Sequence, residues 1–142
     1  MNPNYKHVLT IYNRLRSKDS NDQREHWQST ILEHCFYKAQ TIEVQSGTEA
    51  KKTNSYTVRI PEDDRYLPYN QWKALSAEER TVHFTVSEGD IVIKGRCTDD
   101  ITGTSPATAA GLLSAHKPDA FQVTAFSDNT SHLMGGHYRI GG

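Results

Sequence analysis

The chain has 142 residues, of which 35% are hydrophobic, and its 16 Lys and Arg against 17 Asp and Glu give a formal net charge of -1. That length fits one domain with a modest core. The balanced charge argues against a protein that grips nucleic acid by neutralising phosphates, which needs a basic face. Globular domains usually contain roughly 45–50% apolar residues with Gly counted, and this chain stays below that range even with its nine Gly. We therefore expect it to complete its stability by packing against other subunits.

The two cysteines, Cys35 and Cys97, stand far apart in the chain and form no CxxC motif. The simplest interpretation is two reduced thiols in an intracellular protein, with a disulfide as the alternative. The first residues, MNPNYKHVL, lack the long apolar segment of a signal peptide. No apolar run reaches the length of about 18 residues that spans a bilayer. We expect no signal peptide and no contact with a membrane.

Short strands separated by turns are predicted for the first part of the chain. Residues 7–13 alternate as in a strand with two usable faces, and residues 17–24 are rich in turn formers. Residues 26–39 are rich in β-formers, which favours a long, bent strand. A helix is the alternative there, and it is disfavoured because residues 30–37 contain several poor helix formers.

Two further strands are predicted at residues 41–44 and 55–60, and Pro61 ends the second of them. The stretch between them carries no large apolar side chain, which predicts a long hairpin loop. The residues of this loop are Gln45, Ser46, Gly47, Thr48, Glu49, Ala50, Lys51, Lys52, Thr53 and Asn54.

Residues 61–80 form an insertion that is dense in aromatic side chains. Such side chains require burial, so we expect the insertion to cover a face of the domain, with a short helix near residues 71–75. Packing against a neighbouring subunit is one interpretation, and packing in the core of the chain itself is the other. The candidate packing residues are Tyr66, Leu67, Tyr69 and Trp72.

The second half of the chain predicts a hairpin, a helix and two more strands. Residues 81–86 and 91–94 are expected to pair around the turn Ser87-Glu88-Gly89-Asp90, where Gly89 tolerates positive φ and Asp90 can bond to backbone. Ser105-Pro106 is typical of a helix start, and that helix should end before Pro118. The last strands are predicted at residues 121–126 and 137–140.

Together these elements predict a mainly β fold in a single domain spanning residues 1–142. We expect a small antiparallel β-barrel or sandwich with one or two short helices and long loops.

The sequence gives little support for a metal site. His132, Met134 and His137 form the tightest group of potential ligands, but a closed structural zinc site requires four Cys or His ligands at recognisable spacing. The acidic stretches at residues 62–64 and 99–100 lack the ligand pattern of an EF-hand. We expect solvated acidic loops and no bound metal.

Catalytic motifs are equally weak. No GxSxG motif is present, and with seven His in the chain the pairing of Cys35 or Cys97 with one of them has no diagnostic value. The stretch RCTDDITGTSP, residues 96–106, fits an exit from the central hairpin into a small helix better than an active site. We predict that the protein is not an enzyme and uses no cofactor.

Several segments occur in an order that resembles a known family. They are LTIYNR near the start, YTVRIP, FTVSEGDIVIKG, DDITGTSP, DAFQVTAFSDN and the closing GGHYRIGG. This succession covers nearly the whole chain and is similar to small tailed-phage and prophage proteins of Gram-positive bacteria, encoded among minor capsid and head-tail joining genes. One difference is Tyr138, where relatives carry Trp.

The resemblance implies a stopper-like head-completion protein of the virion neck. Such a β-barrel assembles with itself as a ring, a hexamer or a dodecamer, below the portal or adaptor protein and above the tail terminator or tail tube protein. It retains packaged DNA, which passes through the lumen without sequence-specific binding, and it docks the tail. Before assembly the protein would reside in the host cytoplasm.

Two other functions stay open. An adaptor or tail terminator ring of the same neck is the nearer one, and a small β-barrel binding module for nucleic acid or metal is the one from another class. In the connector, residues 45–54 are the candidate lumen-facing or inter-ring loop. An ordinary exposed hairpin loop is the competing interpretation for that segment.

Overall fold

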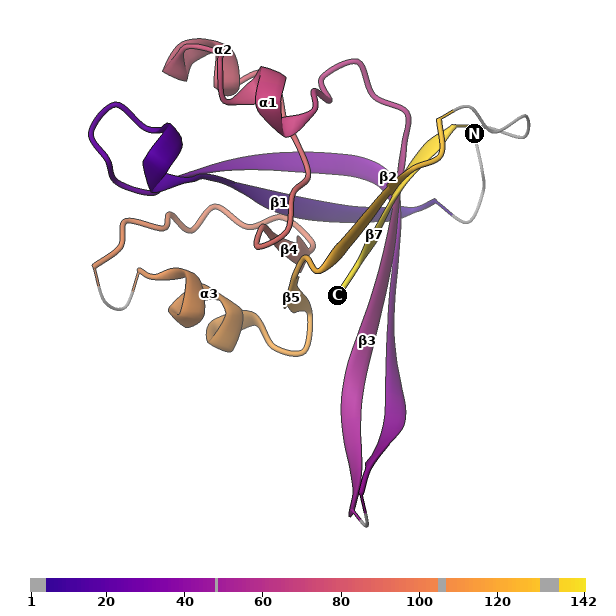
Figure 1. Ribbon diagram of the computed structural model, residues 1–142. Helices are drawn as coiled ribbons and strands as arrows, with labels where there is room; N and C mark the ends of the chain where they lie inside the picture. Colours follow the sequence, from indigo (N-terminus) through magenta and orange to yellow (C-terminus); the bar gives the residue numbers. More distant parts are fainter. Residues whose placement is uncertain (1–4, 48, 105–106, 131–135) are drawn as a thin grey trace.

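The computed structural model describes residues 5–47, 49–104, 107–130 and 136–142, with backbone alone at 44–46 and 49–52. Its strands and three short α-helices are shown in Figure 1. In chain order they are β1 (His7–Leu15), the 3-10 turn η1 (Ser17–Asp19), β2 (His26–Ser46), β3 (Glu49–Pro61), α1 (Tyr69–Trp72), α2 (Ala77–Arg80), β4 (Ile91–Lys94), α3 (Ala109–His116), β5 (Ala120–Gln122), β6 (Ala125–Asp128) and β7 (His137–Gly141). The predicted mainly β fold is confirmed, with three α-helices in the described residues where one or two were expected.

The seven strands of the described residues belong to one curled, half-barrel antiparallel sheet, in the order β5-β4-β1-β2-β3-β7-β6. The two edge strands are neighbours in the chain, because only Val123 and Thr124 separate β5 from β6. Their backbone groups bond to different strand regions: the Gly89 amide, just before β4, donates to the Val123 carbonyl, and the Thr124 amide donates to the carbonyl of Gly141 in β7. The prediction of one strand over residues 121–126 was therefore wrong, since the chain changes partner in the middle of that stretch.

The long, bent strand predicted at residues 26–39 is confirmed as the first part of β2, which continues through residues 41–44, where a separate strand was predicted. The first half of β2 pairs with β1 and its second half pairs with β3. The register against β1 shifts between His7 and Leu9, and His34 adopts a positive φ of 58° opposite that shift. An extra residue of this kind is a β-bulge, which bends a strand and increases its twist. The bend allows β2 to pair with β1 in one half of the sheet and with β3 in the other.

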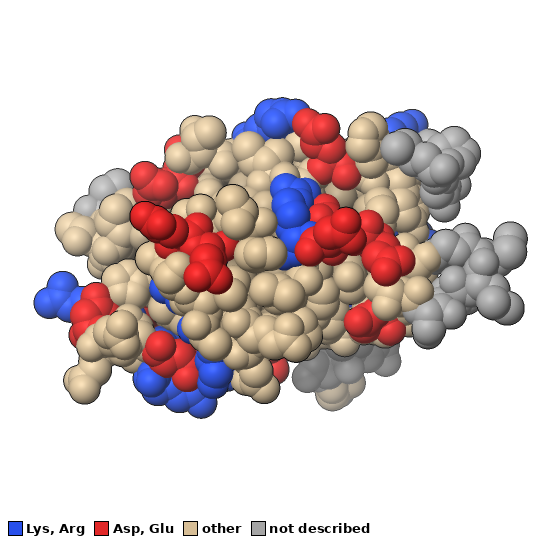
Figure 2. All heavy atoms as spheres, turned by 90° about the horizontal axis from the view of Figure 1, so that it is seen from above, with Lys and Arg blue, Asp and Glu red and all other residues tan. Residues whose placement is uncertain are grey.

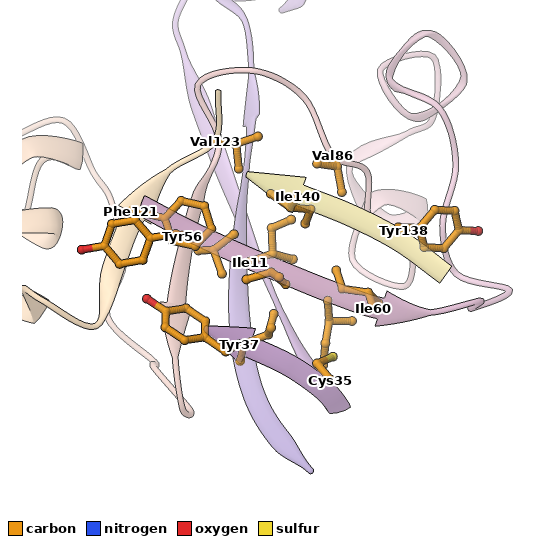
Figure 3. Close-up of a cluster of buried hydrophobic side chains, with 14 of the residues drawn as sticks. Ile11, Cys35, Tyr37, Tyr56, Ile60, Val86, Phe121, Val123, Tyr138 and Ile140 are labelled. Atoms are coloured by element: carbon orange, nitrogen blue, oxygen red, sulfur yellow. The ribbon is translucent and has the colours of Figure 1, made fainter. Parts of the chain in front are cut away.

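The concave side of the sheet holds the main core, in which aromatic and aliphatic side chains from both halves interdigitate (Figure 3). Tyr56 and Phe121 stack at 4.7 Å between ring centroids. The opposite face of β1 and β4 packs under α3, where Tyr12, Ile91 and Ile93 contact Leu112 in a second cluster. Burial on both sides explains why residues 7–13 alternate without a polar face.

The predicted hairpin of residues 81–86 with 91–94 does not form. β4 pairs with β1 on one side and β5 on the other, so neither edge is left for another strand. Residues 81–86 instead run as irregular backbone with a single parallel bridge between Tyr66 and Phe84. Phe84 and Val86 are buried in the main core, which accounts for the strand-like apolar pattern.

The predicted turn at Ser87-Glu88-Gly89-Asp90 is present, and Gly89 has a φ of +96°. Asp90 does more than form the turn. Its carboxylate is buried and accepts hydrogen bonds from three nitrogens. The donors are Asn13 Nδ2 at 2.9 Å, the Arg14 amide at 3.0 Å and the Ser87 amide at 2.9 Å. The side chain thus ties the turn to β1.

Replacing Asp90 by Asn is expected to lower the free energy of unfolding by about 1–3 kcal/mol, because an amide NH₂ cannot accept from the nitrogens that face it. Burial outweighs these donors and raises the pKa of Asp90 to about 6. Its folded-state pKa is therefore above the unfolded value of about 3.9. The stabilising effect of the carboxyl is fully present below about pH 4 and is lost as the pH rises through about 6.

Urea unfolding of wild type and Asp90→Asn at about pH 4.5 and pH 7.5 tests this expectation. The difference in free energy of unfolding between the two proteins should be larger at the lower pH. An equal difference at both values would contradict a raised pKa for Asp90.

The helix on the flank of the sheet begins later than predicted. Thr108 is its N-cap, with the side-chain oxygen accepting from the Gly111 amide at 3.1 Å. The predicted start at Ser105-Pro106 lies outside the described residues. The helix ends at His116, before Pro118 as expected.

Candidate functional site

Two regions of the molecule are candidates for function, and the first is the end of the β2–β3 hairpin. β7 pairs with β3 only from Thr57 onward, while β2 and β3 pair with each other as far as Ser46 and Glu49. Figure 1 shows this part projecting away from the body as a two-stranded ribbon. We call residues 40–55 the ribbon, and at the rise of a β-strand it extends roughly 20 Å beyond the sheet.

Both faces of the ribbon are open in the described residues. Side chains at 40–43 and at 53 and 54 are exposed, and Ile42 is 38% exposed. A hydrogen bond of 3.1 Å joins Thr41 Oγ1 to Asn54 Oδ1 across the pair. No other described strand adds to the ribbon, so its outer edges keep free backbone groups.

The prediction of a long loop at residues 45–54 is wrong. Strand pairing continues through Gln45 with Ala50 and Ser46 with Glu49, and Gly47, with a φ of +65°, lies in the turn. The segment is therefore the tip of a β-hairpin. Its polar composition misled the prediction, because a strand exposed on both faces needs no apolar side chains.

The four residues proposed for subunit packing differ in their accessibility. Trp72 is completely buried in its own chain, so the prediction of a subunit contact was wrong for this residue. Tyr66 is half-buried and lies 4.3 Å from Tyr138 between ring centroids, on the edge of the core. Leu67 and Tyr69 are half-buried, and they remain candidates for contact with a neighbour.

The second candidate region lies where the chain leaves β4 and passes under α3. Gly95 turns the chain with a φ of +91°, and the buried Thr10 hydroxyl holds the backbone on both sides of Arg96. It donates to the Gly95 carbonyl at 2.8 Å and accepts from the Cys97 amide at 2.9 Å. Thr10 thereby sets the position of the Cys97 side chain against the sheet.

Three potential ligands meet at this point, which we call the Cys97 cluster: Cys97, Asp99 and His116. The Nε2 atom of His116 lies 3.6 Å from Cys97 Sγ and 3.2 Å from Asp99 Oδ2. The ligand atoms of all three lie within 4.8 Å of one another. Cys97 is 5% exposed, whereas the side chain of Asp99 is 65% exposed. The cluster is therefore buried at its sulfur and open at its carboxylate.

Tyr12 closes the inner side of the cluster. Its hydroxyl lies 2.6 Å from the Asp99 carbonyl oxygen and 3.1 Å from Cys97 Sγ. Burial, followed by the contact with Cys97, raises the pKa of Tyr12 far above its usual value. The phenol is therefore neutral, and its single proton can be donated to the carbonyl or to the sulfur.

The arrangement differs from a catalytic triad. In a triad the base uses one ring nitrogen for the nucleophile and the other for the orienting carboxylate. Here Nε2 of His116 faces both Cys97 and Asp99. Sulfur, nitrogen and oxygen directed at one another are instead the donor set of a transition-metal site.

A pocket of about 510 Å³ adjoins the open side of the cluster, between α3 and the segment after β4. Asp99 lies on its wall together with Thr102, Thr108 and Leu112. A small molecule or a water network in this pocket would reach the exposed carboxylate of Asp99.

The surface charge is mixed. Figure 2 shows the face that lies uppermost in Figure 1, where acidic and basic side chains are interspersed among uncharged ones. Arg65 pairs with Asp63 at 2.8 Å, and Lys73 pairs with Asp19 at 3.3 Å. The basic side chains described on this face do not merge into a continuous patch.

A model of a protein family matches nearly the whole chain. The model of DUF6751, described as a family of unknown function, matches residues 5–142. The chain belongs to DUF6751. No curated protein and no solved structure matches this DUF6751 chain. Among the described helices, none has the length and apolarity to cross a membrane.

In the described residues of this DUF6751 chain, the other groups of potential metal ligands considered from the sequence do not come together in one site. His132 and Met134 lie outside the described residues, and His137 opens β7, with its Nε2 3.5 Å from Asn129 Nδ2. In the stretch at residues 62–64, the hydrogen bond from Arg65 lowers the pKa of Asp63. Neither group belongs to the three-ligand cluster in the described part of the chain.

Sequence reasoning missed the Cys97 cluster in this DUF6751 chain, although it considered Cys97 and Asp99 separately. The spacing Cys97-x-Asp99 followed by His116 matches no standard zinc motif. His116 comes close only because α3 packs back onto β4 and β5. The one available signal was a Cys and an Asp two residues apart, followed by a short helix ending in His.

Proposed function

We propose that the protein is a structural subunit of the head-tail connector of a tailed phage. In this role it forms a stopper-like ring between the portal or adaptor protein and the tail, retains packaged DNA and docks the tail. The observation that carries the proposal is the ribbon, residues 40–55, which projects from the sheet without a third strand.

A two-stranded hairpin alone is only marginally stable in water, and its free edges are templates for pairing with another chain. Natural proteins cover or shorten such edges unless the edges have a use. The exposed Ile42 gives the ribbon an apolar side chain on one face. These features favour a neighbouring subunit of the same chain as the surface on which the ribbon lies.

A ring results from such a contact when the ribbon of one copy binds a different surface of the next copy. Contacts of this heterologous kind close into rings when the rotation between copies allows it. The exposed Val82 and the half-buried Leu67 and Tyr69 supply apolar atoms for the opposing side of that contact.

The charge distribution agrees with a channel that lets DNA pass. Affinity for DNA rises with the number of phosphates that Lys and Arg neutralise. With a net charge of -1, and with interspersed charges on the face seen in Figure 2, this chain is not suited to strong retention by phosphate contacts. Retention of DNA in the proposed ring is therefore steric.

Deletion of the reading frame in a phage or prophage that encodes the chain tests the proposal, with electron microscopy of the released particles. The expected result is heads that have lost their DNA beside separate tails of normal appearance, restored to whole virions by a plasmid copy. Attached tails on full heads in the deletion strain would contradict the connector role. Tails of abnormal length would instead favour the tail terminator.

A further inference from the structure

We propose that Cys97, Asp99 and His116 form a binding site for a divalent transition-metal ion, with Zn²⁺ as the preferred class. This inference does not depend on the connector role, because the three side chains lie within one chain and away from the ribbon.

The ligand types suit zinc. Zn²⁺ binds thiolate, imidazole and carboxylate, and it favours tetrahedral coordination with ligand distances of about 2.0–2.3 Å. Carboxylate and carbonyl sites without sulfur suit Mg²⁺ and Ca²⁺, whereas the thiolate of Cys97 selects a softer ion. Binding would displace the thiol proton of Cys97 to the solvent.

The distances fit as well. Two ligands on a tetrahedral zinc ion are separated by about 3.3–3.8 Å when the bonds have the lengths given above. The observed separations are 3.6 Å from Cys97 Sγ to His116 Nε2 and 3.2 Å from that nitrogen to Asp99 Oδ2. The third separation is no more than 4.8 Å, and rotation of the exposed Asp99 side chain would shorten it.

The surroundings hold the ligands in place. Thr10 fixes the backbone of Cys97 through its hydroxyl, and α3, capped by Thr108, carries His116 in its last turn. Tyr12 is within 3.1 Å of the sulfur, and its proton can turn from the Asp99 carbonyl to a thiolate. Hydrogen bonds from outside the ligand set orient metal ligands and tune the ion.

Three protein ligands leave a fourth position, which is typical of sites where zinc keeps an exchangeable water. Asp99 is the outermost ligand and also lies on the wall of the adjoining pocket. The fourth position would therefore open toward solvent and that pocket. The ion would join the segment after β4 to the end of α3, and stabilise this flank of the sheet.

Titration of the purified chain with Co²⁺, followed by displacement with Zn²⁺, tests the proposal. Thiolate bound to Co²⁺ gives a charge-transfer absorption band, which reports the sulfur ligand directly. We expect this band at one ion per chain, its loss on adding Zn²⁺, and a higher Tm with Zn²⁺ than with a chelator.

Three variants and two controls identify the ligands. Cys97→Ser and His116→Gln should each weaken binding by at least about 10–100-fold, the size known for loss of outer-shell partners alone. Asp99→Asn should weaken it too, and because its side chain is exposed the substitution should leave the fold intact. Cys35→Ala, at the other cysteine, and His26→Gln, in an exposed His-Asp pair, should leave affinity unchanged.

The absence of a thiolate band in the wild type would overturn the proposal. Equal affinity in wild type and Asp99→Asn would overturn the ligand set, because that variant changes the exposed carboxylate alone. If Cys35→Ala loses the band and Cys97→Ser keeps it, the sulfur ligand is Cys35. That result would also contradict the proposed site.

Discussion

Replacing residues 41–54 by Asn-Gly, so that Gln40 and Ser55 flank a two-residue turn, is expected to abolish assembly of the connector and leave the fold intact. Asn-Gly supports the tight turn that a two-residue hairpin requires. The deleted residues contribute no strand pairing except with one another, so the free energy of unfolding should change by less than about 1 kcal/mol.

The variant should be tested by complementing a strain in which the reading frame is deleted and imaging the particles. We expect separate heads and tails, as without the protein. Ser114→Ala, at an exposed position of α3 outside both sides of the proposed contact, is the control, and it should restore whole virions. Normal virions from the shortened chain would show that the ribbon has no part in assembly.

Trp72→Ala is expected to lower the free energy of unfolding by about 3–5 kcal/mol, the usual range for removing a fully buried aromatic side chain. Trp72 is 0% exposed, and its ring lies beside Tyr69 and below the guanidinium of Arg80. Loss of the ring would leave a cavity under α1 and loosen the insertion from the sheet.

Two further variants make this prediction specific. Trp72→Phe should cost less, because the buried Trp72 Nε1 has no hydrogen-bond partner among the described atoms and its loss leaves no donor unsatisfied. Val82→Ala, at a side chain that is 62% exposed, should change stability by less than about 0.5 kcal/mol. Urea unfolding measures all three. A small effect of Trp72→Ala on stability would contradict the conclusion that this side chain stabilises its own chain by packing in the interior.

Local sequence patterns correctly predicted three strands that pack against their immediate neighbours in the sheet. The alternation at residues 7–13 identified β1, and the β-formers from Trp27 to Tyr37 identified the long β2. The closing strand at residues 137–140 was also predicted, because its apolar residues face the core in a regular alternation. The side-chain period of two indicated β1 and the closing strand, whereas β2 was recognised by its composition, because the β-bulge at His34 interrupts its period.

The errors arose where partners distant in sequence decide the structure. Residues 81–86 have the apolar pattern of a strand, but β1 and β5 already occupy both edges of β4. Residues 121–126 look like one strand, yet Val123 and Thr124 pass from one edge of the curled sheet to the other. Neither outcome is encoded in the local pattern of these residues.

The candidate sites show the same limit. Residues 45–54 contain no large apolar side chain, so the sequence offered no apolar period from which to infer strands there. The Cys97 cluster depends on how α3 packs on the second face of the sheet, which brings His116 to Cys97 across the intervening loop. The sequence analysis considered Cys97 and Asp99 separately, did not single out His116, and could not show that the three residues lie close together.

The connector role is tested most directly by locating the chain in purified virions, with mass spectrometry of the particles and cryo-electron microscopy of the neck. We expect a ring of density between portal and tail that fits the curled sheet, with each ribbon lying on the adjacent copy. Absence of the chain from purified, infectious virions would contradict the connector role.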